Sequence, residues 1–133
     1  MDIQFEIGNT ATLAKTFTEG DVLQFASLSE DRNPIHIDPE AGGASVFGAQ
    51  VVHGMLVASL ISGLLGLHLP GPGTIYLGQD LRFKAPVFIG DEITAIVEVT
   101  AIRRDKPIAT LRTYCVNQKD TVVIDGEATV KYA

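Results

Sequence analysis

The chain has 133 residues, of which 46% are hydrophobic and 20% are charged, and its formal net charge at pH 7 is −6. This length allows one domain with a sizeable core, and the composition is that of an ordinary globular protein, not a disordered tail. The acidic balance argues against a general nucleic-acid-binding protein, which needs a basic face to neutralise phosphates. The single cysteine, Cys115, excludes a disulfide framework and a cysteine-based metal cluster.

Two features of the sequence indicate where the protein resides. The N-terminal residues contain no basic segment followed by a long apolar stretch, so we expect no signal peptide. Residues 51–67 are the most apolar segment, but polar residues and glycines interrupt them and make a poor membrane span. We therefore expect a cytoplasmic protein with neither membrane nor nucleic acid as a partner, in which Cys115 is buried and unreactive.

The first elements in chain order are a strand and a helix. Residues 10–17 predict a first strand. Thr18 followed by Asp21 has the pattern of a capping box, in which each residue satisfies the backbone of the other at a helix start. Apolar residues at helical spacing follow, so a short amphipathic helix is predicted there.

The next segment is governed by two prolines. Pro34 disfavours the α region for Asn33, so we predict a turn or loop over residues 30–37. Asp38 and Pro39 then have the residue types of a helix cap and a first helical position, which predicts a second short helix.

The longest predicted helix covers residues 53–66. It is apolar nearly all round, which is typical of a helix buried on every side. At 1.5 Å per residue it would be roughly 20 Å long. The proline- and glycine-rich residues 69–73 end it.

After Gly73 the apolar residues alternate with polar ones. This period of two predicts four half-buried strands joined by short turns, as in an antiparallel meander. One apolar helix and one sheet with a single apolar face predict an α+β fold in which the sheet curls around the helix. We expect residues 1–133 to form this single domain.

Four sequence segments carry a resemblance to a known family. Residues 25–36 read Phe-Ala-Ser-Leu-Ser-Glu-Asp-Arg-Asn-Pro-Ile-His, and matching runs follow at residues 52–55, 75–79 and 86–91. Together they resemble the MaoC-like (R)-specific enoyl-CoA hydratases, the hydratase 2 group, and in particular the short-chain bacterial type linked to polyhydroxyalkanoate synthesis. The resemblance covers essentially the whole chain and implies a hot dog fold. Glu30 is a departure, because many family members carry glycine there.

The resemblance implies an activity and its partners. The expected reaction is the reversible hydration of trans-2-enoyl-CoA to (R)-3-hydroxyacyl-CoA, with short acyl chains preferred. The family also implies a homodimer with the substrate cleft between subunits, and an exposed sheet edge favours such pairing on physical grounds. Coenzyme A is part of the substrate, and we expect no other cofactor and no metal, since no Cys/His ligand spacing or glycine-rich phosphate loop appears.

The resemblance assigns catalysis to Asp31 and His36. Hydration needs a base for water, an acid for C2 and donors for the thioester oxygen. A proline-fixed turn can aim a carboxylate and an imidazole five residues apart into one pocket. We favour His36 as the group that activates water and Asp31 as the group that protonates C2. Otherwise Asp31 caps a turn and His36 is structural, and Asn33 either supports the site or only forms the turn.

Further site residues are expected along the long helix. Gly54 stands at its start, where the backbone N–H groups lack partners, and the family uses this N–H as an oxyanion donor; close packing is the alternative. Ser62 needs a partner, and the resemblance favours a supporting role in the site. Leu65 and Val130 are expected to close a short acyl pocket, whereas we interpret His53 as structural or supporting.

Other interpretations of the chain remain open. A hot dog thioesterase would direct water to the carbonyl carbon. An acyl-carrier-protein dehydratase of the other hot dog type has a histidine followed by a Phe-Pro-Gly run, which this chain lacks. A non-catalytic acyl-CoA-binding subunit would be expected to lose Asp31 or His36. The basic residues Arg103, Arg104 and Lys106 form either a solvated turn or a contact for a phosphorylated molecule.

Overall fold

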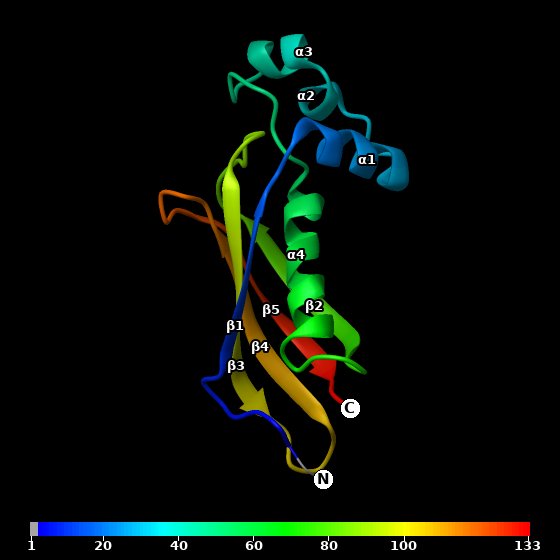
Figure 1. The fold of residues 1–133 in the computed structure, drawn as a ribbon, viewed down its shortest axis with the longest axis vertical. Helices are drawn as coiled ribbons and strands as arrows, with labels where there is room; N and C mark the ends of the chain where they lie inside the picture. Colours follow the sequence, from blue (N-terminus) through cyan, green and yellow to red (C-terminus); the bar gives the residue numbers. More distant parts are fainter. Residues whose placement is uncertain (1–2) are drawn as a thin grey trace.

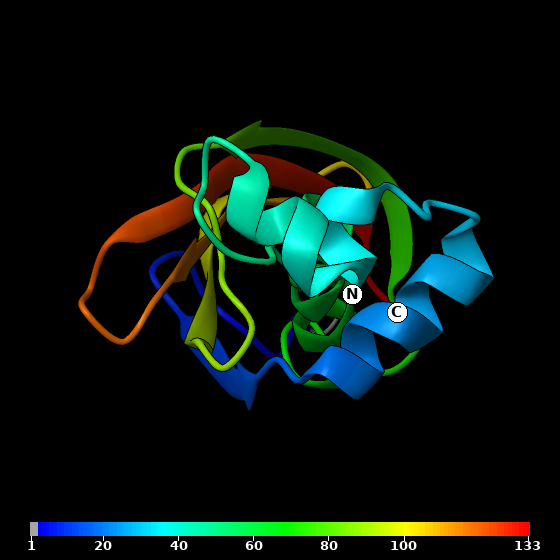
Figure 2. The same cartoon turned by 90° about the horizontal axis from the view of Figure 1, so that it is seen from above.

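The computed structural model describes residues 3–133; Met1 and Asp2, where the predicted single domain begins, lie outside the described residues. A curved antiparallel sheet lies along one long helix, which confirms the predicted α+β hot dog architecture (Figures 1 and 2). In chain order the elements are β1 (Thr10–Thr16), α1 (Glu19–Ser29), α2 (Pro34–Ile37), α3 (Pro39–Ala44), α4 (Gly54–Leu67), β2 (Ile75–Phe83), β3 (Glu92–Ile102), β4 (Ile108–Val116) and β5 (Val122–Lys131).

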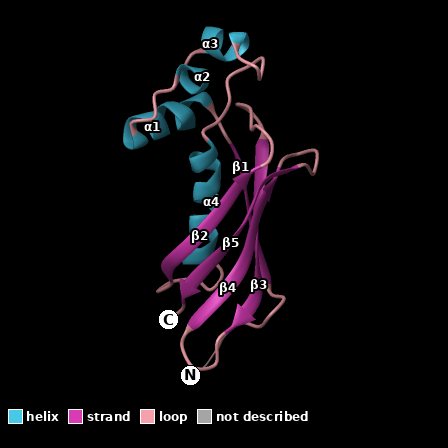
Figure 3. Cartoon of the chain, turned by 180° about the vertical axis from the view of Figure 1, so that it is seen from behind, coloured by secondary structure: helices cyan, strands magenta, loops and turns pink. Residues whose placement is uncertain are grey.

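The sheet has the strand order β1-β3-β4-β5-β2, with every neighbouring pair antiparallel (Figure 3). The predicted four-strand meander is correct for β3, β4 and β5 but wrong for β2, which pairs with β5 instead of β3. The reason is that a period of two specifies which face of a strand is buried, not which strand lies beside it. As a result β1 and β2 form the two edges of the sheet.

The connection from β2 to β3 crosses one end of the sheet. Its Val87 carbonyl accepts a hydrogen bond from the N–H of Val52 at 2.7 Å, just before α4. The N–H of Gly90 donates to the Phe17 carbonyl at 2.7 Å, and the N–H of Phe17 donates to the Asp91 carbonyl at 3.2 Å. The loop thereby connects the start of α4 with the end of β1.

Helix α4 packs one face against the sheet. Burying a large aliphatic side chain contributes roughly 1.5–3 kcal/mol, so this contact is a principal source of stability. The buried residues of α4 are Val57, Ala58, Leu60, Ile61, Leu64 and Leu65. The opposite face, with Met55, Ser59 and Ser62, is exposed. The expectation that the helix is buried on every side is therefore wrong for the single chain, because the sheet covers only one side.

The predicted helix start at Thr18 is confirmed. The hydroxyl of Thr18 accepts from the N–H of Asp21 at 3.2 Å, and the Asp21 carboxylate accepts from the N–H of Thr18 at 3.0 Å. The hydrogen bond to the Asp21 carboxylate also lowers its pKa. The predicted cap at Asp38 is confirmed too, because its carboxylate accepts from the N–H of Glu40 at 3.0 Å.

The predicted turn over residues 30–37 is only partly correct. Its second half is the short helix α2, which begins at Pro34. Proline is well suited to the first helical position, where its missing N–H would have no partner in any case. The restriction that it imposes falls on Asn33, which adopts φ −54° and ψ 124° and accepts a hydrogen bond from the N–H of Ile35 at 3.3 Å.

The short helices α1, α2 and α3 gather beyond the N-terminal end of α4, whereas the C-terminus lies at the other end of the sheet (Figure 1). None of the helices formed by residues 3–133 has the length and apolar character needed to cross a bilayer.

Cys115 is fully buried, and burial raises the pKa of its thiol to about 12, so the predicted buried thiol is confirmed.

Candidate active site

Asp31 lies in the exposed loop that follows α1. The loop begins at Glu30, whose φ of 66° places it in the left-handed region that favours glycine. The Asp31 N–H donates to the hydroxyl of Ser29 at 3.1 Å, and one Asp31 carboxylate oxygen accepts from the N–H of Asn33 at 3.2 Å. The left-handed turn and these local bonds place the Asp31 carboxylate at the start of the next turn.

His36 belongs to α2, and its side chain is nearly buried. Its Nδ1 lies 2.6 Å from the carbonyl oxygen of Val51. Because a carbonyl can only accept, Nδ1 must carry the hydrogen, and Nε2 of the neutral ring then keeps a free lone pair. The backbone carbonyl of His36 accepts a further hydrogen bond from the Gln50 side chain at 2.9 Å.

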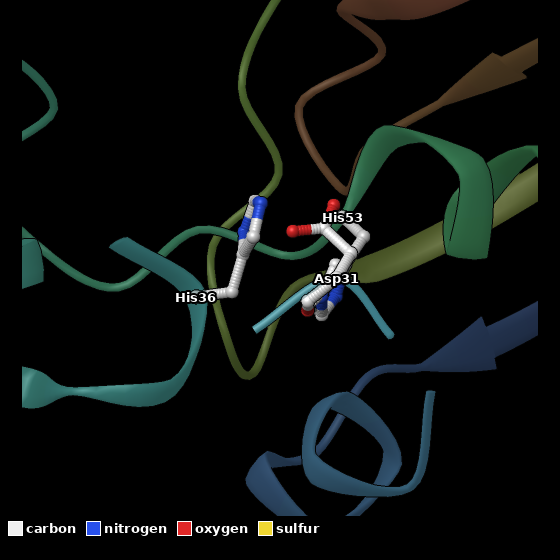
Figure 4. Close-up of side chains that lie close together, drawn as sticks. All are labelled: Asp31, His36 and His53. Carbon is white, nitrogen blue, oxygen red and sulfur yellow. Dashed lines mark hydrogen bonds between the residues drawn. The ribbon is translucent and has the colours of Figure 1, made fainter. Parts of the chain in front are cut away.

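Three side chains from separate parts of the chain meet beside this loop (Figure 4). A carboxylate oxygen of Asp31 and one ring nitrogen each of His36 and His53 all lie within 4.8 Å of one another. One water molecule can therefore contact both the carboxylate and the imidazole. The expected proximity of Asp31 and His36 is present in the structure, while their catalytic role stays a prediction.

His53 has more contacts within this cluster than its interpretation from the sequence, as structural or supporting, indicated. It is 2% exposed, its ring stacks on that of His36 with centroids 4.0 Å apart, and its Nε2 lies 2.9 Å from the backbone carbonyl of Asp31. Its position directly before Gly54 was the only signal in the sequence. A lone histidine at a helix start does not reveal which loop it will contact.

The cluster is not arranged as a ready metal site. Metal ligands direct their lone pairs at one point about 2.0–2.2 Å away. Here the rings of His36 and His53 are stacked with 26° between their planes, so the lone pairs in the two ring planes run side by side instead of converging on one point. This geometry supports the expectation of a metal-free site, which stays a prediction.

Gly54 is the first residue of α4, close to the cluster. The first N–H groups of a helix lack intrahelical acceptors and lie at the positive end of the helix dipole. The side chain of His53, the N-cap residue, makes no hydrogen bond to them either. A Cβ at Gly54 would lie only 2.6 Å from Cε1 of Phe83. The close packing considered as an alternative is therefore real, and it is compatible with an N–H that remains available as a donor.

A cavity of about 560 Å³ opens between α4 and β2. Its wall is mostly apolar, and it is lined by Phe25, Met55, Ala58, Ser59, Ser62, Tyr76, Leu77, Gly78, Gln79 and Leu81. Ser62 is exposed to this cavity, so its hydroxyl faces the open side of α4 instead of a buried partner.

Gln79 and Tyr76 supply polar groups to the cavity wall. The Gln79 amide donates to the hydroxyl of the fully buried Thr113 at 2.9 Å and to the Asp80 carbonyl at 2.6 Å, and it accepts from the Tyr76 hydroxyl. Gln79 therefore both lines the cavity and satisfies a backbone carbonyl. Partial burial raises the pKa of Tyr76.

Leu65 and Val130 do not belong to the cavity wall. Both are almost completely buried in the core between α4 and the sheet. Their expected part in closing the acyl pocket stays a prediction, since it requires the pocket to reach the core behind Ser62.

The basic residues Arg103, Arg104 and Lys106 lie in an exposed turn, in which Arg103 binds Asp105 at 2.9 Å; this agrees with the solvated-turn interpretation.

Comparisons with known proteins agree on one family. The model of the MaoC like domain matches residues 4–120. The chain is 57% identical to an (R)-specific enoyl-CoA hydratase of Aeromonas caviae over 126 residues, which are 95% of this chain and 94% of that protein. It is 50% identical to a protein of the same name from Rhodospirillum rubrum over 123 residues, 92% of this chain and 85% of that one.

A solved structure and a more distant relative add to this picture. The structure of the A. caviae (R)-hydratase, described as involved in PHA biosynthesis, superposes with a TM-score of 0.96 at 55% identity over 98% of both chains. A mitochondrial 3-hydroxyacyl-[acyl-carrier-protein] dehydratase of Solanum lycopersicum is 45% identical over 126 residues, 93% of this chain and 75% of that protein.

The left-handed conformation of Glu30 leads to a stability prediction. Side chains other than glycine are strained there, and the ion pair of Glu30 with Arg32 is exposed and contributes little. We expect Glu30→Gly to be more stable to urea than Glu30→Ala by about 1 kcal/mol in free energy of unfolding. Both variants lack the carboxylate, so equal stabilities would show that the backbone conformation of Glu30 carries no strain.

Proposed function

The chain belongs to the MaoC-like domain family, and from this premise we propose that it hydrates trans-2-enoyl-CoA reversibly to (R)-3-hydroxyacyl-CoA. The observation that carries the proposal is the approach of Asp31 and His36 within 4.8 Å. Their neighbour His53 is the N-cap of α4, and Met55 in the first turn of that helix lines an apolar cavity that suits an acyl chain. The named activity of the A. caviae and R. rubrum relatives described above supports the same reaction.

The geometry suggests how the two groups divide the work. Nε2 of His36, left free by the bond from Nδ1 to Val51, takes a proton from water while the water oxygen adds to C3. The carboxyl group of Asp31 delivers its proton to C2. The proton taken up by His36 then returns to Asp31 across the short distance between them, which restores the pair and balances the reaction.

The remaining groups hold the substrate. The N–H of Gly54, at the positive end of α4, stabilises the negative charge that develops on the thioester oxygen. Asn33 supports the site through its backbone N–H, which binds the Asp31 carboxylate. Ser62 contacts the substrate from the cavity wall, with the acyl chain lying along the apolar residues beside it.

Replacing either catalytic group tests the assignment. We expect Asp31→Asn and His36→Gln each to lower turnover of crotonyl-CoA by ~10²–10⁴-fold, because each removes one half of the acid–base pair. The double variant should be little worse than either single one, since the two groups act as a unit. Ser62→Ala should lower turnover by less than either of the single variants. The measurement is the loss of enoyl absorbance.

Asp38→Asn is the matched control for these variants. It makes the same acid-to-amide change at the cap of α3, where asparagine caps equally well, and it should keep wild-type turnover. An Asp31→Asn or His36→Gln enzyme with near-wild-type hydration would contradict the catalytic assignment. A wild type without any hydration of crotonyl-CoA would instead favour the thioesterase or the non-catalytic acyl-CoA-binding subunit.

Chain-length preference tests the proposed acyl pocket. If the acyl tail reaches the core behind Ser62, then Leu65→Ala and Val130→Ala should extend the accepted chain length at some loss of stability. The measurement is the specificity constant against chain length. Ile93→Ala, a fully buried change on β3 outside the cavity wall, controls for core loosening. Profiles that shift no more than that of Ile93→Ala would remove Leu65 and Val130 from the pocket.

A second candidate differs only in the carrier of the acyl group. The S. lycopersicum relative is named as a dehydratase of acyl-carrier-protein thioesters, and the same acid–base pair could serve that carrier. The specificity constants for crotonyl-CoA and the corresponding carrier-protein thioester distinguish the two. We further propose that the enzyme is cytoplasmic and supplies (R)-3-hydroxyacyl-CoA from fatty acid β-oxidation for polyhydroxyalkanoate synthesis. The A. caviae structure is described as involved in PHA biosynthesis, which supports the link to that synthesis.

We also propose that a second copy of the chain covers the β2 surface, formed by Met55, Tyr76, Leu77 and Phe83. These apolar side chains are 40–59% exposed, and β2 is an unpaired edge of the sheet. Exposed edges and contiguous apolar patches favour association. Since the cavity opens on this surface, the second copy would complete the cleft.

A charge on the β2 surface should prevent this association. Leu77→Glu places a carboxylate in the proposed interface, so we expect it to sediment as a monomer while the wild type sediments as a dimer. Leu28→Glu is the control, because it changes an equally apolar and even more exposed residue on α1 and should stay dimeric. A wild type that is fully active as a monomer would contradict the proposed dimer.

A further inference from the structure

The side chain of His53 is held in a particular environment between two other rings. It is 2% exposed, with the edge of Phe25 at a centroid distance of 4.9 Å and the face of His36 at 4.0 Å. Its Nε2 lies 2.9 Å from the backbone carbonyl oxygen of Asp31. One buried ring therefore contacts both proposed catalytic residues, the imidazole of one and the peptide of the other.

The hydrogen-bond partner of His53 fixes its tautomer. A carbonyl can only accept, so Nε2 carries the hydrogen and donates it, and Nδ1 of the neutral ring keeps the lone pair. Within residues 3–133 this Nδ1 is buried and has no hydrogen-bond partner. An unpartnered buried polar atom is unfavourable, so an apolar residue would fill the same space at a lower cost in folding free energy. The bond from Nε2 to Asp31 is the contact that an apolar residue could not provide.

That contact acts on the less constrained member of the catalytic pair. The ring of His36 is already oriented by its own bond to Val51. Asp31, in contrast, lies in an exposed loop, and its carboxylate accepts one bond, from the N–H of its near neighbour Asn33. The bond from His53 ties the Asp31 peptide to the N-cap residue of α4, the helix that packs against the core.

We propose that His53 is a positioning residue: its Nε2–H holds Asp31, and its ring holds His36, at the separation that the acid–base pair needs. This inference rests on the proposed hydration. Because His53 directly precedes Gly54, the same residue also sets the carboxylate and imidazole relative to the N–H proposed to bind the thioester oxygen. A displacement of about 1 Å in such a constellation can lower the rate about 10²-fold.

Two substitutions separate the contacts of His53. His53→Phe keeps a ring against His36 and Phe25 but lacks the donor to Asp31, whereas His53→Gln keeps a donor and lacks the ring. We expect His53→Phe to lower kcat for crotonyl-CoA by about 10²-fold with KM changed by less than about twofold. His53→Gln should recover at least about tenfold of that loss, because the bond to Asp31 is the contact that the rest of the loop cannot replace.

A change in kcat alone must be distinguished from loosening of the core. Val97→Ala, fully buried on β3, serves as the control: its activity should fall only with the folded fraction, measured by circular dichroism. A folded His53→Phe enzyme with wild-type kcat, or a His53→Gln enzyme no better than His53→Phe, would overturn the proposal. An inactive wild type would instead reject the proposed hydration itself.

The tautomer can be tested on the wild-type protein, whether or not the variants fold. Imidazole ¹⁵N chemical shifts should show the hydrogen of neutral His53 on Nε2 and that of neutral His36 on Nδ1, since each of these atoms faces a carbonyl. A His53 ring with its hydrogen on Nδ1 would exclude the bond to Asp31 and with it the positioning role.

Discussion

The packing of α4 against the curved sheet is the interaction on which the rest of the structure depends. Its buried residues recur on one face of the helix, and each of the large aliphatic ones contributes roughly 1.5–3 kcal/mol when it is removed from water. The helix therefore packs in one orientation along the sheet, and this fixes the position of its N-terminal end. Gly54 and His53 lie at that end, so the positions of the Gly54 N–H, proposed as the oxyanion donor, and of the buried His53 ring follow from the packing of residues up to about three turns away.

Around this fixed helix end, the segment that carries Asp31 and His36 is assembled mostly from short-range interactions. The capping box at Thr18 begins α1, the left-handed Glu30 ends it, and Asn33 with Pro34 begins α2. These local features place Asp31 and His36 a few residues apart on either side of a turn. A small number of contacts connect this turn to the residues just before α4. His53 contacts Asp31 and His36, and His36 contacts Val51. Gln50 and the N–H of Val51 also bind backbone carbonyls of α2. The separation of the pair thus depends on both local geometry and a few long-range bonds.

The open side of α4 has the opposite character. Apolar residues of α4 and of the edge strand β2 remain exposed around the cavity, and the polar groups there are limited to Ser59, Ser62, Gln79 and Tyr76. Such a surface suits an acyl chain and a second protein surface better than water. In the single chain the proposed acid–base cluster therefore lies at the N-terminal end of α4, while the cleft between α4 and β2 is open on its outer side.

The sequence by itself determined the features that depend on near neighbours and on periodicity. The caps at Thr18 and Asp38, the long apolar helix, the alternating strands and the closeness of Asp31 to His36 were all predicted, because each follows from residues within a few positions or from a clear period. Tertiary structure decided the pairing of β2 with β5, the exposed face of α4 and the contacts of His53. A period of two specifies a buried face but not a neighbour, and an apolar helix does not reveal how much of it a sheet will cover. A histidine at position 53 gives no indication that the chain will bring residue 31 to it, since that contact exists only once the helix has packed.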